Sequence, residues 1–194
     1  TIGTEIVAKS APDGYTLLVG PIAAAVIAQL YHRKGYDMRR DFAFITKIGY
    51  GTIVLVVPPN LGVASVKELI ALAKAKPGQL SFASSGTGAN IHLTGEMFKQ
   101  RAGIDILHVP YKGTTQLLPD LIEGRISMAL DSMPAYLPHI KSGRVRPLAV
   151  ASLKRSAQLP DVPTMTEAGL PGFQANTDYA LFAPAGTPKE IVAR

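Results

Sequence analysis

The spacing of hydrophobic residues changes repeatedly from one segment of the chain to the next. Residues 53–57 (IVLVV) are apolar without a break, as expected of a strand that is covered on both faces, and Pro58-Pro59 ends this run. Helical signals then follow, and strand signals return after them. Because strand and helix signals alternate along the chain, the pattern predicts an α/β architecture.

The same pattern predicts individual elements. Ser65 followed by Glu68 forms a capping box, so a helix is expected to begin there and to stop before Pro77. One more helix is expected to end near residue 9. The other expected helices span residues 23–30, 90–101, 116–123 and 135–141. The expected strands are 15–20, 42–48, 52–57, 80–83, 106–109, 126–130 and 147–151.

These elements suggest two lobes. Residues 59–172 contain several βα units and are expected to form one complete lobe, lobe 2. Residues 1–58 and 173–194 would together build parts of lobe 1. Such a chain crosses between the lobes twice, and a ligand cleft commonly lies between two such lobes.

Composition narrows the class of protein. Hydrophobic residues make up 47% of the chain and charged residues 18%, which is typical of a globular protein rather than a disordered one. The net charge of +6 suits an anionic ligand, but the basic residues are scattered, so we expect no nucleic-acid partner. The absence of cysteine excludes disulfides, thiol catalysis and a cysteine-based metal site. No apolar run reaches the roughly 18 residues that span a bilayer, so we expect no membrane insertion.

The two ends of the sequence do not resemble the ends of a natural domain. The chain begins with Thr1, without an initiator Met or a charged-then-apolar leader. Its last residues, 189–194, look like a helix that is cut short. We therefore expect a fragment of a longer protein.

Residues 84–90 (SSGTGAN) carry the strongest chemical signal. They follow a predicted strand and precede a predicted helix, where free backbone amides and the positive end of the helix dipole favour an anion. The glycines allow close backbone approach, and Ser84, Ser85 and Thr87 add hydroxyl donors. The pattern fits a carboxylate-binding loop, and it equally fits an ordinary βα turn with Ser or Thr as helix cap. A phosphate loop is excluded, because the Gly-Lys-Ser/Thr ending is absent.

No catalytic or metal-binding set is visible. His92 lies at i−4 from Glu96, so a helical side-chain pair is its simplest role. The four histidines are dispersed rather than spaced as zinc ligands, and the Gly-x-Ser-x-Gly nucleophile elbow is missing. We therefore expect binding without catalysis, and no metal or organic cofactor.

Two other predicted strand ends carry polar residues. Lys112 follows the strand at 106–109, and Asp131 follows the strand at 126–130. Parallel strands of one sheet end at the same edge, so these loops are expected to converge on the loop at 84–90. Lys112 can complement an anion or be a solvated side chain beside Tyr111. Asp131 can accept from a ligand or cap the next helix.

Motifs along nearly the whole chain resemble the substrate-binding proteins of the TctC or Bug family. The motifs that carry this resemblance are Gly3 with residues 11–18 (APDGYTLL), 75–78 (AKPG), 84–88 (SSGTG), His92-Leu93, 109–113 (VPYKG), 160–164 (PDVPT) with 167–169 (EAG), and 183–188 (APAGTP). Each motif is weak alone, but together and in this order they are specific.

The resemblance implies a periplasmic receptor of a tripartite tricarboxylate transporter. Its fold would be that of a type II periplasmic binding protein, with two α/β lobes joined by two crossing strands and a hinge that closes on the ligand. Its partners would be a small organic carboxylate and the membrane subunits of the transporter. Residues 84–90 match the second-lobe ligand loop, so Ser84, Ser85, Thr87, Gly88 and Asn90 are the expected ligand contacts.

The resemblance also has departures. The first strand of the family, with its Pro-Gly-Gly-rich loop, would precede Thr1, and the C-terminal helices of the family would follow Arg194. Near the hinge the family commonly carries Trp, where this chain has Asp178 and Tyr179, which we also expect to contribute to ligand binding. The alternatives to a transport receptor are a ligand sensor for a signalling partner and a hydrolase that uses Ser84 or Ser85.

Overall fold

The structure is a computed structural model that describes residues 2–22 and 35–193. The predicted helix at 23–30 lies outside the described residues. The chain forms two compact units, which are described separately: residues 1–50 with 177–194, and residues 51–176. The boundaries of the predicted lobes, after residues 58 and 172, stay a prediction.

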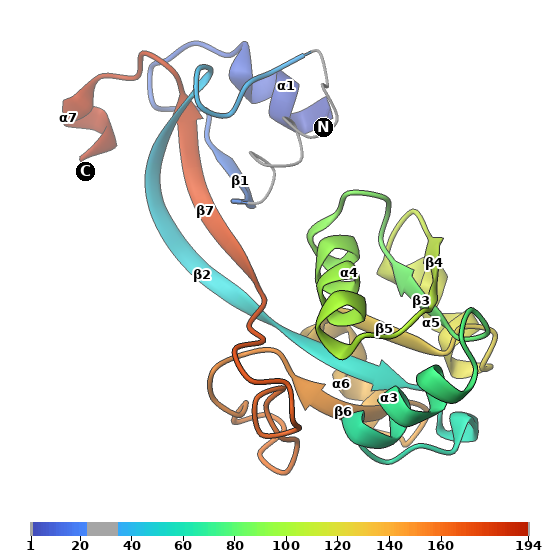
Figure 1. Cartoon of the computed structure of the whole chain (residues 1–194). Coiled ribbons are helices and arrows are strands. Elements are labelled where there is room, and N and C mark those ends of the chain that lie inside the picture. The colour runs from blue at the N-terminus through green and yellow to red at the C-terminus, as the bar shows by residue number, and fades with distance from the viewer. Residues whose placement is uncertain (1, 23–34, 194) are drawn as a thin grey trace. The chain divides into compact units, whose positions relative to one another are not determined.

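The second unit is built on a five-stranded part of the sheet in the order β6–β2–β5–β3–β4 (Figure 1). The strand β2 (Phe42–Val57) pairs antiparallel with β5 (Met128–Ser132) on one side and with β6 (Arg146–Val150) on the other. The strand β3 (Ser81–Ser84) runs parallel to β5 and to β4 (Leu107–Pro110). The α/β class predicted from the sequence is therefore confirmed.

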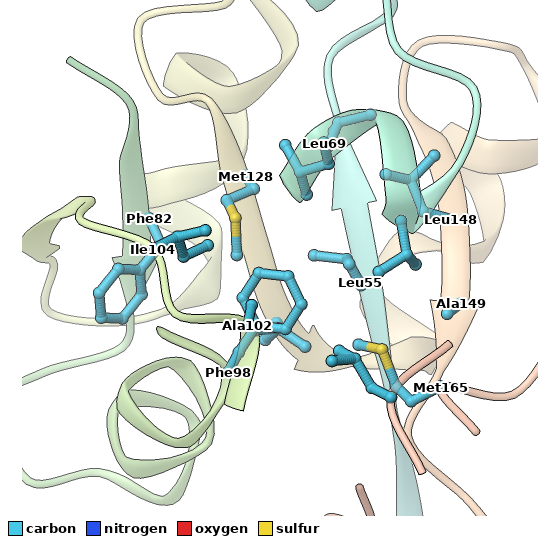
Figure 2. Close-up of a cluster of buried hydrophobic side chains, with 14 of the residues drawn as sticks. Leu55, Leu69, Phe82, Phe98, Ala102, Ile104, Met128, Leu148, Ala149 and Met165 are labelled. Carbon is cyan, nitrogen blue, oxygen red and sulfur yellow. The ribbon is translucent and has the colours of Figure 1, made fainter. Parts of the chain in front are cut away.

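Four helices cover the two faces of this sheet. Helices α3 (Val66–Ala75) and α4 (Asn90–Ala102) pack on one face, while α5 (Thr114–Ile122) and α6 (Met133–Lys141) pack on the other. Each face has its own cluster of buried hydrophobic side chains, and Figure 2 shows the cluster on the α3 and α4 face.

The unbroken apolar run of β2 explains why two clusters form. Ile53, Leu55 and Val57 belong to the cluster under α3 and α4, and Val54 and Val56 belong to the cluster under α5 and α6. All five side chains are fully buried. Burial of one such side chain stabilises the fold by about 1.5–3 kcal/mol, so both faces of β2 contribute to stability.

The first unit is smaller and has a smaller core. It contains α1 (Ile2–Ala8), β1 (Leu18–Pro21), the short α7 (Lys189–Val192), the beginning of β2 and most of β7 (Asn176–Pro184). The strand β1 pairs antiparallel with β7, which lies between β1 and β2 in the sheet. The buried cluster of this unit consists of Val7, Met38, Phe42, Ala180 and Phe182.

The local predictions were mostly right, with one correction. Ser65 Oγ accepts from the Glu68 amide at 3.2 Å, and Glu68 Oε2 accepts from the Ala64 amide at 2.8 Å, so the predicted helix start is confirmed. The two strands predicted at 42–48 and 52–57 were wrong, because they form one strand of 16 residues. Gly49 and Gly51 lie between the two predicted segments, but neither has a positive φ, and extended backbone continues through both.

Both β2 and β7 run across the boundary between the two units along the chain, as the predicted pair of crossing strands would. Among residues 2–22 and 35–193, no helix combines the length and the apolar character needed to cross a lipid bilayer.

Candidate functional site

The carboxyl ends of three parallel strands meet at one edge of the second unit. Since β3 pairs in parallel with β4 and with β5, the loops that follow them leave the sheet at the same side. The Tyr111 amide donates to the Ser84 carbonyl oxygen at 2.9 Å, which joins the first two loops. Thr114 Oγ1, at the start of α5, donates to Asp131 Oδ2, near the end of β5, at 2.7 Å, which joins the segment after β4 to the end of β5. The sequence predicted this convergence, and these contacts confirm it.

The loop at residues 84–90, called here the anion loop, is held by hydrogen bonds of its own. The Gly86 amide donates to Ser84 Oγ at 3.2 Å, and the Ala89 amide donates to the Gly86 carbonyl oxygen at 3.1 Å. The Gly88 amide donates to His92 Nδ1 at 3.0 Å. Gly86 and Gly88 have φ values of 132° and 79°, which L side chains rarely adopt, so this loop shape depends on glycine.

Other donors of the anion loop are left open. Within the described part of the chain, no hydrogen bond occupies the hydroxyls of Ser85 and Thr87 or the amides of Ser85, Thr87 and Ile91. The N-cap residue of α4 is Ala89, which supplies no side-chain acceptor. The alternative in which a Ser or Thr of this turn caps the helix is therefore not realised. An anion can supply the acceptors that the start of this helix lacks.

Asn90 is the first residue of α4 and fastens the anion loop from its far end. Its Nδ2 donates to the carbonyl oxygen of Asn176 at 3.0 Å, and its own carbonyl oxygen accepts from Thr94 Oγ1 at 2.9 Å. The amide side chain of Asn90 therefore has a structural role in this arrangement as well as its predicted role in ligand binding.

Beneath the anion loop lies a stack of three rings from Phe82, His92 and His108. The ring centroids of the two histidines are 4.0 Å apart, and those of Phe82 and His108 are 4.9 Å apart. His108 Nε2 lies 2.7 Å from Ser84 Oγ. Burial lowers the pKa of His108, and a charge on His92 lowers it further.

Sequence reasoning did not foresee this stack. It treated His92 as the partner of Glu96, but Nε2 of His92 lies 3.9 Å from the Glu96 carboxylate, while Nδ1 holds the anion loop. His108 and Ser84 are 24 residues apart in the sequence. The signal that could have found them is the parallel register of β3 and β4, which pairs Phe82 with His108.

Lys112 and Tyr111 follow β4 and differ in their environment. Lys112 is exposed, and its backbone amide donates to Gln116 Oε1 at 3.3 Å. The Tyr111 hydroxyl donates to Asp120 Oδ2 at 2.6 Å; burial and this hydrogen bond raise the pKa of Tyr111 to about 12. Lys112 is thus a solvated cation near the anion loop, while the Tyr111 hydroxyl is directed to Asp120.

Asp131 is almost completely buried, with 3% of its surface exposed. Its carboxylate accepts from Thr114 Oγ1, from the Ser132 amide at 2.6 Å and from the Tyr136 hydroxyl at 3.1 Å. Burial raises the pKa of Asp131, although each of these hydrogen bonds acts in the opposite direction. Both carboxylate oxygens have protein donors, and a role in ligand binding stays a prediction.

The two predicted residues near the hinge belong to the first unit. Asp178 lies on β7 and forms an ion pair with Lys47 of β2, with a separation of 2.6 Å. Tyr179 is opposite Pro21 of β1 and is partly exposed. The anion loop, Lys112 and Asp131 are all in the second unit, so the structure brings together the predicted residues of that unit only. Among the described residues, no group of three or more His, Cys, Asp or Glu side chains is arranged to hold a metal ion.

Comparison with known proteins gives one consistent family. The sequence model of one protein family, the tripartite tricarboxylate transporter family receptor, matches residues 1–194. The chain is 42% identical over 194 residues to a UPF0065 protein in the tcbD-tcbE intergenic region of a Pseudomonas species, and 42% identical over 193 residues to protein BugT of Bordetella pertussis. It covers 58% and 59% of these two proteins, so it spans about three fifths of their length.

Solved structures agree with this result. R. palustris Rpa4515 with adipate has a TM-score of 0.89 and 39% identity, with 98% of this chain and 64% of that chain covered. MatC from Rhodopseudomonas palustris with bound malate has a TM-score of 0.85 and 31% identity, with 100% and 66% covered. The periplasmic binding protein BugD has a TM-score of 0.87 and 34% identity, with 98% and 64% covered. Together with the family model over its whole length, these matches show that the chain belongs to the TctC receptor family, to which the Bug proteins also belong.

Proposed function

We propose that this protein is a periplasmic solute-binding receptor that captures a small organic carboxylate for a tripartite tricarboxylate transporter. The ligand's carboxylate binds to the anion loop, and closure of the two lobes traps it. The protein binds its ligand and releases it unchanged to the membrane subunits of the transporter.

The open donors of the anion loop carry this proposal. Two hydroxyls and three amides have no partner in the described part of the chain, and they cluster at the uncapped start of a helix of 13 residues. A carboxylate accepts such hydrogen bonds and is favoured by the positive end of the helix dipole. Hydrogen bonds to a charged group contribute roughly 1.5–3 kcal/mol each, so a few of them suffice for specific binding.

The relatives support a carboxylate as the ligand class. The similar structures of Rpa4515 and MatC hold adipate and malate, which are both dicarboxylates. We propose Ser84, Ser85, Thr87, Gly88 and Asn90 as the clamp for one carboxylate. Lys112, Asp131, Asp178 and Tyr179 are proposed as weaker contributors.

Calorimetric titration with adipate and malate tests the proposal, in a protein with the full length of the relatives. We expect one of these acids or another small carboxylate to bind, and the neutral diamide of adipate not to bind. Ser85→Ala and Thr87→Ala should each weaken binding by about 0.5–1.5 kcal/mol, the usual contribution of one neutral hydroxyl. Gly88→Val should weaken it more than tenfold, because its φ of 79° strains any side chain there.

Thr166→Ala is the matched control. Thr166 is an exposed hydroxyl residue of the same unit, outside the anion loop, so its removal should leave binding unchanged. Binding of the neutral diamide as tightly as the acid, or unchanged binding in the Ser85, Thr87 and Gly88 variants, would refute the assignment of the charge to this loop.

One observation favours a second candidate, a serine-dependent hydrolase. Ser84 Oγ lies 2.7 Å from His108 Nε2, the distance expected of a nucleophile and its general base. Against it, the Ser84 side chain is fully buried, and no carboxylate of the described residues lies within ion-pair distance of His108. Hydrolysis of simple esters that Ser84→Ala abolishes would establish this candidate in place of the receptor.

Transport and location need cellular tests. Uptake of a labelled carboxylate should require both this protein and the transporter's membrane subunits, and the protein should be released with the periplasmic fraction. A ligand-dependent decrease in the radius of gyration, measured by small-angle X-ray scattering, should accompany closure.

A further inference from the structure

The anion loop rests on two imidazole rings, and each ring holds one of its glycines. His92 accepts the Gly88 amide through Nδ1 at 3.0 Å. His108 contacts Ser84 Oγ through Nε2 at 2.7 Å, and Ser84 Oγ in turn contacts both polar groups of Gly86, accepting from its amide at 3.2 Å and lying 3.1 Å from its carbonyl oxygen. Gly86 and Gly88 flank Thr87, whose amide and hydroxyl are open. The histidines thus determine where these donors point.

The bond to Gly88 defines the protonation state of His92. A backbone amide can only donate, so Nδ1 must be an unprotonated acceptor. An imidazolium carries a proton on both nitrogens, and its Nδ1 proton would face the Gly88 amide proton. The observed loop therefore requires a neutral His92 with its proton on Nε2.

The packing around the rings fixes their positions. His92 and His108 lie nearly parallel, with an interplanar angle of 27°, and Phe82 packs against His108. Gly95 of α4 makes room for Phe82, because a Cβ at this position would overlap the Phe82 ring. Either imidazole can therefore move within the stack only if α4 or β3 moves as well.

We propose that His92 and His108 are positioning residues that hold the anion loop in its carboxylate-binding shape only while His92 is neutral, so that affinity falls when the protein is acidified. This inference rests on the proposed function of the anion loop. Neither histidine need touch the ligand.

The charged groups around the stack favour at most one protonated histidine of the two. Glu96 is 3.9 Å from His92 Nε2 and is also paired with Lys99 at 3.4 Å, so its charge is shared between the two. Burial and a positive charge on His92 both lower the pKa of His108, so the stack disfavours a proton on both rings at once. Histidine side chains ordinarily change charge between about pH 5 and 8, and this sets the pH range of the test.

Two variants of His92 separate positioning from simple packing. His92→Asn retains an acceptor, Oδ1, at the place of Nδ1 but cannot titrate. His92→Phe retains the stacked ring but has no acceptor. At about pH 8, His92→Asn should bind adipate or malate within about twofold of the parent, and His92→Phe should bind about five- to tenfold more weakly, the loss of one hydrogen bond.

The pH profile gives the decisive readout. From about pH 8 to 5.5 the parent should lose at least about fivefold more affinity than His92→Asn, since only the parent loses the Gly88 hydrogen bond. Protonation of the ligand affects both proteins equally and cancels in this comparison. At His108, the conservative His108→Gln, with an amide group in place of Nε2, should bind better than His108→Leu. His139→Gln, which changes a histidine of α6, should retain the profile of the parent.

A measurement without ligand keeps this inference separate from the proposed function. In a ¹⁵N-labelled chain, the Gly88 amide resonance should shift with the same midpoint as the His92 ring, and this shift should vanish in His92→Asn. If no carboxylate binds the parent but Gly88 follows His92, the proposed function fails and the positioning role stands. Identical pH profiles of the parent and His92→Asn, or a Gly88 resonance that ignores His92, would overturn the inference.

Discussion

The two units of the molecule bury their apolar residues to very different extents. In residues 51–176, both faces of the sheet are covered by helices, and large side chains such as Phe82, Phe98 and Leu117 are completely buried. Among residues 2–22, 35–50 and 177–193, the described part of the first unit, the buried cluster is small. Its exposed large hydrophobic residues are Ile2, Ile6, Tyr15, Leu17, Val19, Ile22, Phe44, Ile48, Tyr50 and Tyr179. Stability should therefore be concentrated in the second unit, which also carries the anion loop.

This difference changes how the long strand β2 is interpreted. Its second half, residues 53–57, is buried on both faces, whereas much of its first half is exposed. One strand thus belongs to a complete core at one end and to a sparse one at the other.

The largest effect should come from separating the units. A chain of residues 51–176 should fold cooperatively, because both of its hydrophobic clusters lie within that range. Residues 1–50 joined by a linker to residues 177–194 should not fold, since the buried cluster among the described residues of that unit has five members, too few to offset the entropy of ordering the chain. Thermal unfolding followed by circular dichroism would show a sigmoidal transition for the first chain only. A gradual, non-cooperative change in residues 51–176 would contradict the contrast between the units.

Truncation of one phenylalanine in each unit should reproduce the contrast at single-residue level. Phe98 lies in the cluster under α3 and α4 (Figure 2). It is 0% exposed, whereas Phe44 on β2 is 55% exposed. Phe98→Ala should lower the free energy of unfolding by about 3–5 kcal/mol, through lost burial and the cavity left behind. Phe44→Ala should change it by no more than about 1 kcal/mol, because most of its ring is already in water. Urea denaturation of both variants measures the two values, and equal losses would remove the distinction.

Gly95→Ala tests how tightly the second unit is packed beneath the anion loop. Alanine is favoured over glycine in a helix by about 1 kcal/mol, so an uncrowded position would gain stability. At Gly95 the new Cβ would overlap the Phe82 ring, and such overpacking costs about 1–3 kcal/mol. We therefore expect a net loss of up to about 2 kcal/mol. Gly3→Ala in α1 is the control, since a Cβ there meets no neighbouring atom and the backbone is helical. A stabilised Gly95→Ala variant would show that the ring stack has room to move.

Acidification should weaken the second unit through His108. The folded state lowers the pKa of His108, so below its ordinary pKa of about 6.5 the unfolded chain binds the proton more readily. The contribution of His108 to stability is thus complete above that pH and is lost as the pH falls toward the lowered value. His108→Gln should reduce the pH dependence of the free energy of unfolding over this range, measured by urea denaturation at a series of pH values. An unchanged slope would mean that the ring does not titrate differently in the two states.

The sequence predicted the helices and strands of the second unit better than its ring stack. The reason is that those elements depend on residues close together in the sequence, whereas the stack does not. Unbroken apolar runs, the Ser65 capping box and the turn at residues 84–90 are encoded within a few residues, and the structure contains each of them. The stack of Phe82, His92 and His108 depends on the register between β3 and β4 and on the packing of α4. No single window of sequence contains that information.

The error at β2 has a similar cause. Gly49 and Gly51 are local signals for a break, but β2 is hydrogen-bonded to neighbouring strands of the sheet and stays extended through both glycines. Asp131 shows how far the role of a residue can be predicted from the sequence. Its place at a strand end was predicted, but its three protein donors come from the first residue of α5, the adjacent residue and the following helix. Only the folded chain shows how strongly this carboxylate is engaged.

The smallest effect should come from the ion pair between Lys47 and Asp178 in the first unit. Both side chains are partly exposed, and such pairs contribute about 0–1 kcal/mol, less at high salt. Lys47→Met should therefore lower the free energy of unfolding by less than about 1 kcal/mol, and 0.5 M NaCl, roughly three times the physiological ionic strength, should remove most of the difference. Asp178→Asn removes the same pair but also a residue proposed to contact the ligand. If Asp178 is only the partner of Lys47, both variants should bind the carboxylate equally well; if it contacts the ligand, only Asp178→Asn should change the affinity. A loss of affinity in Lys47→Met alone would contradict both roles and would assign the ligand contact to the lysine.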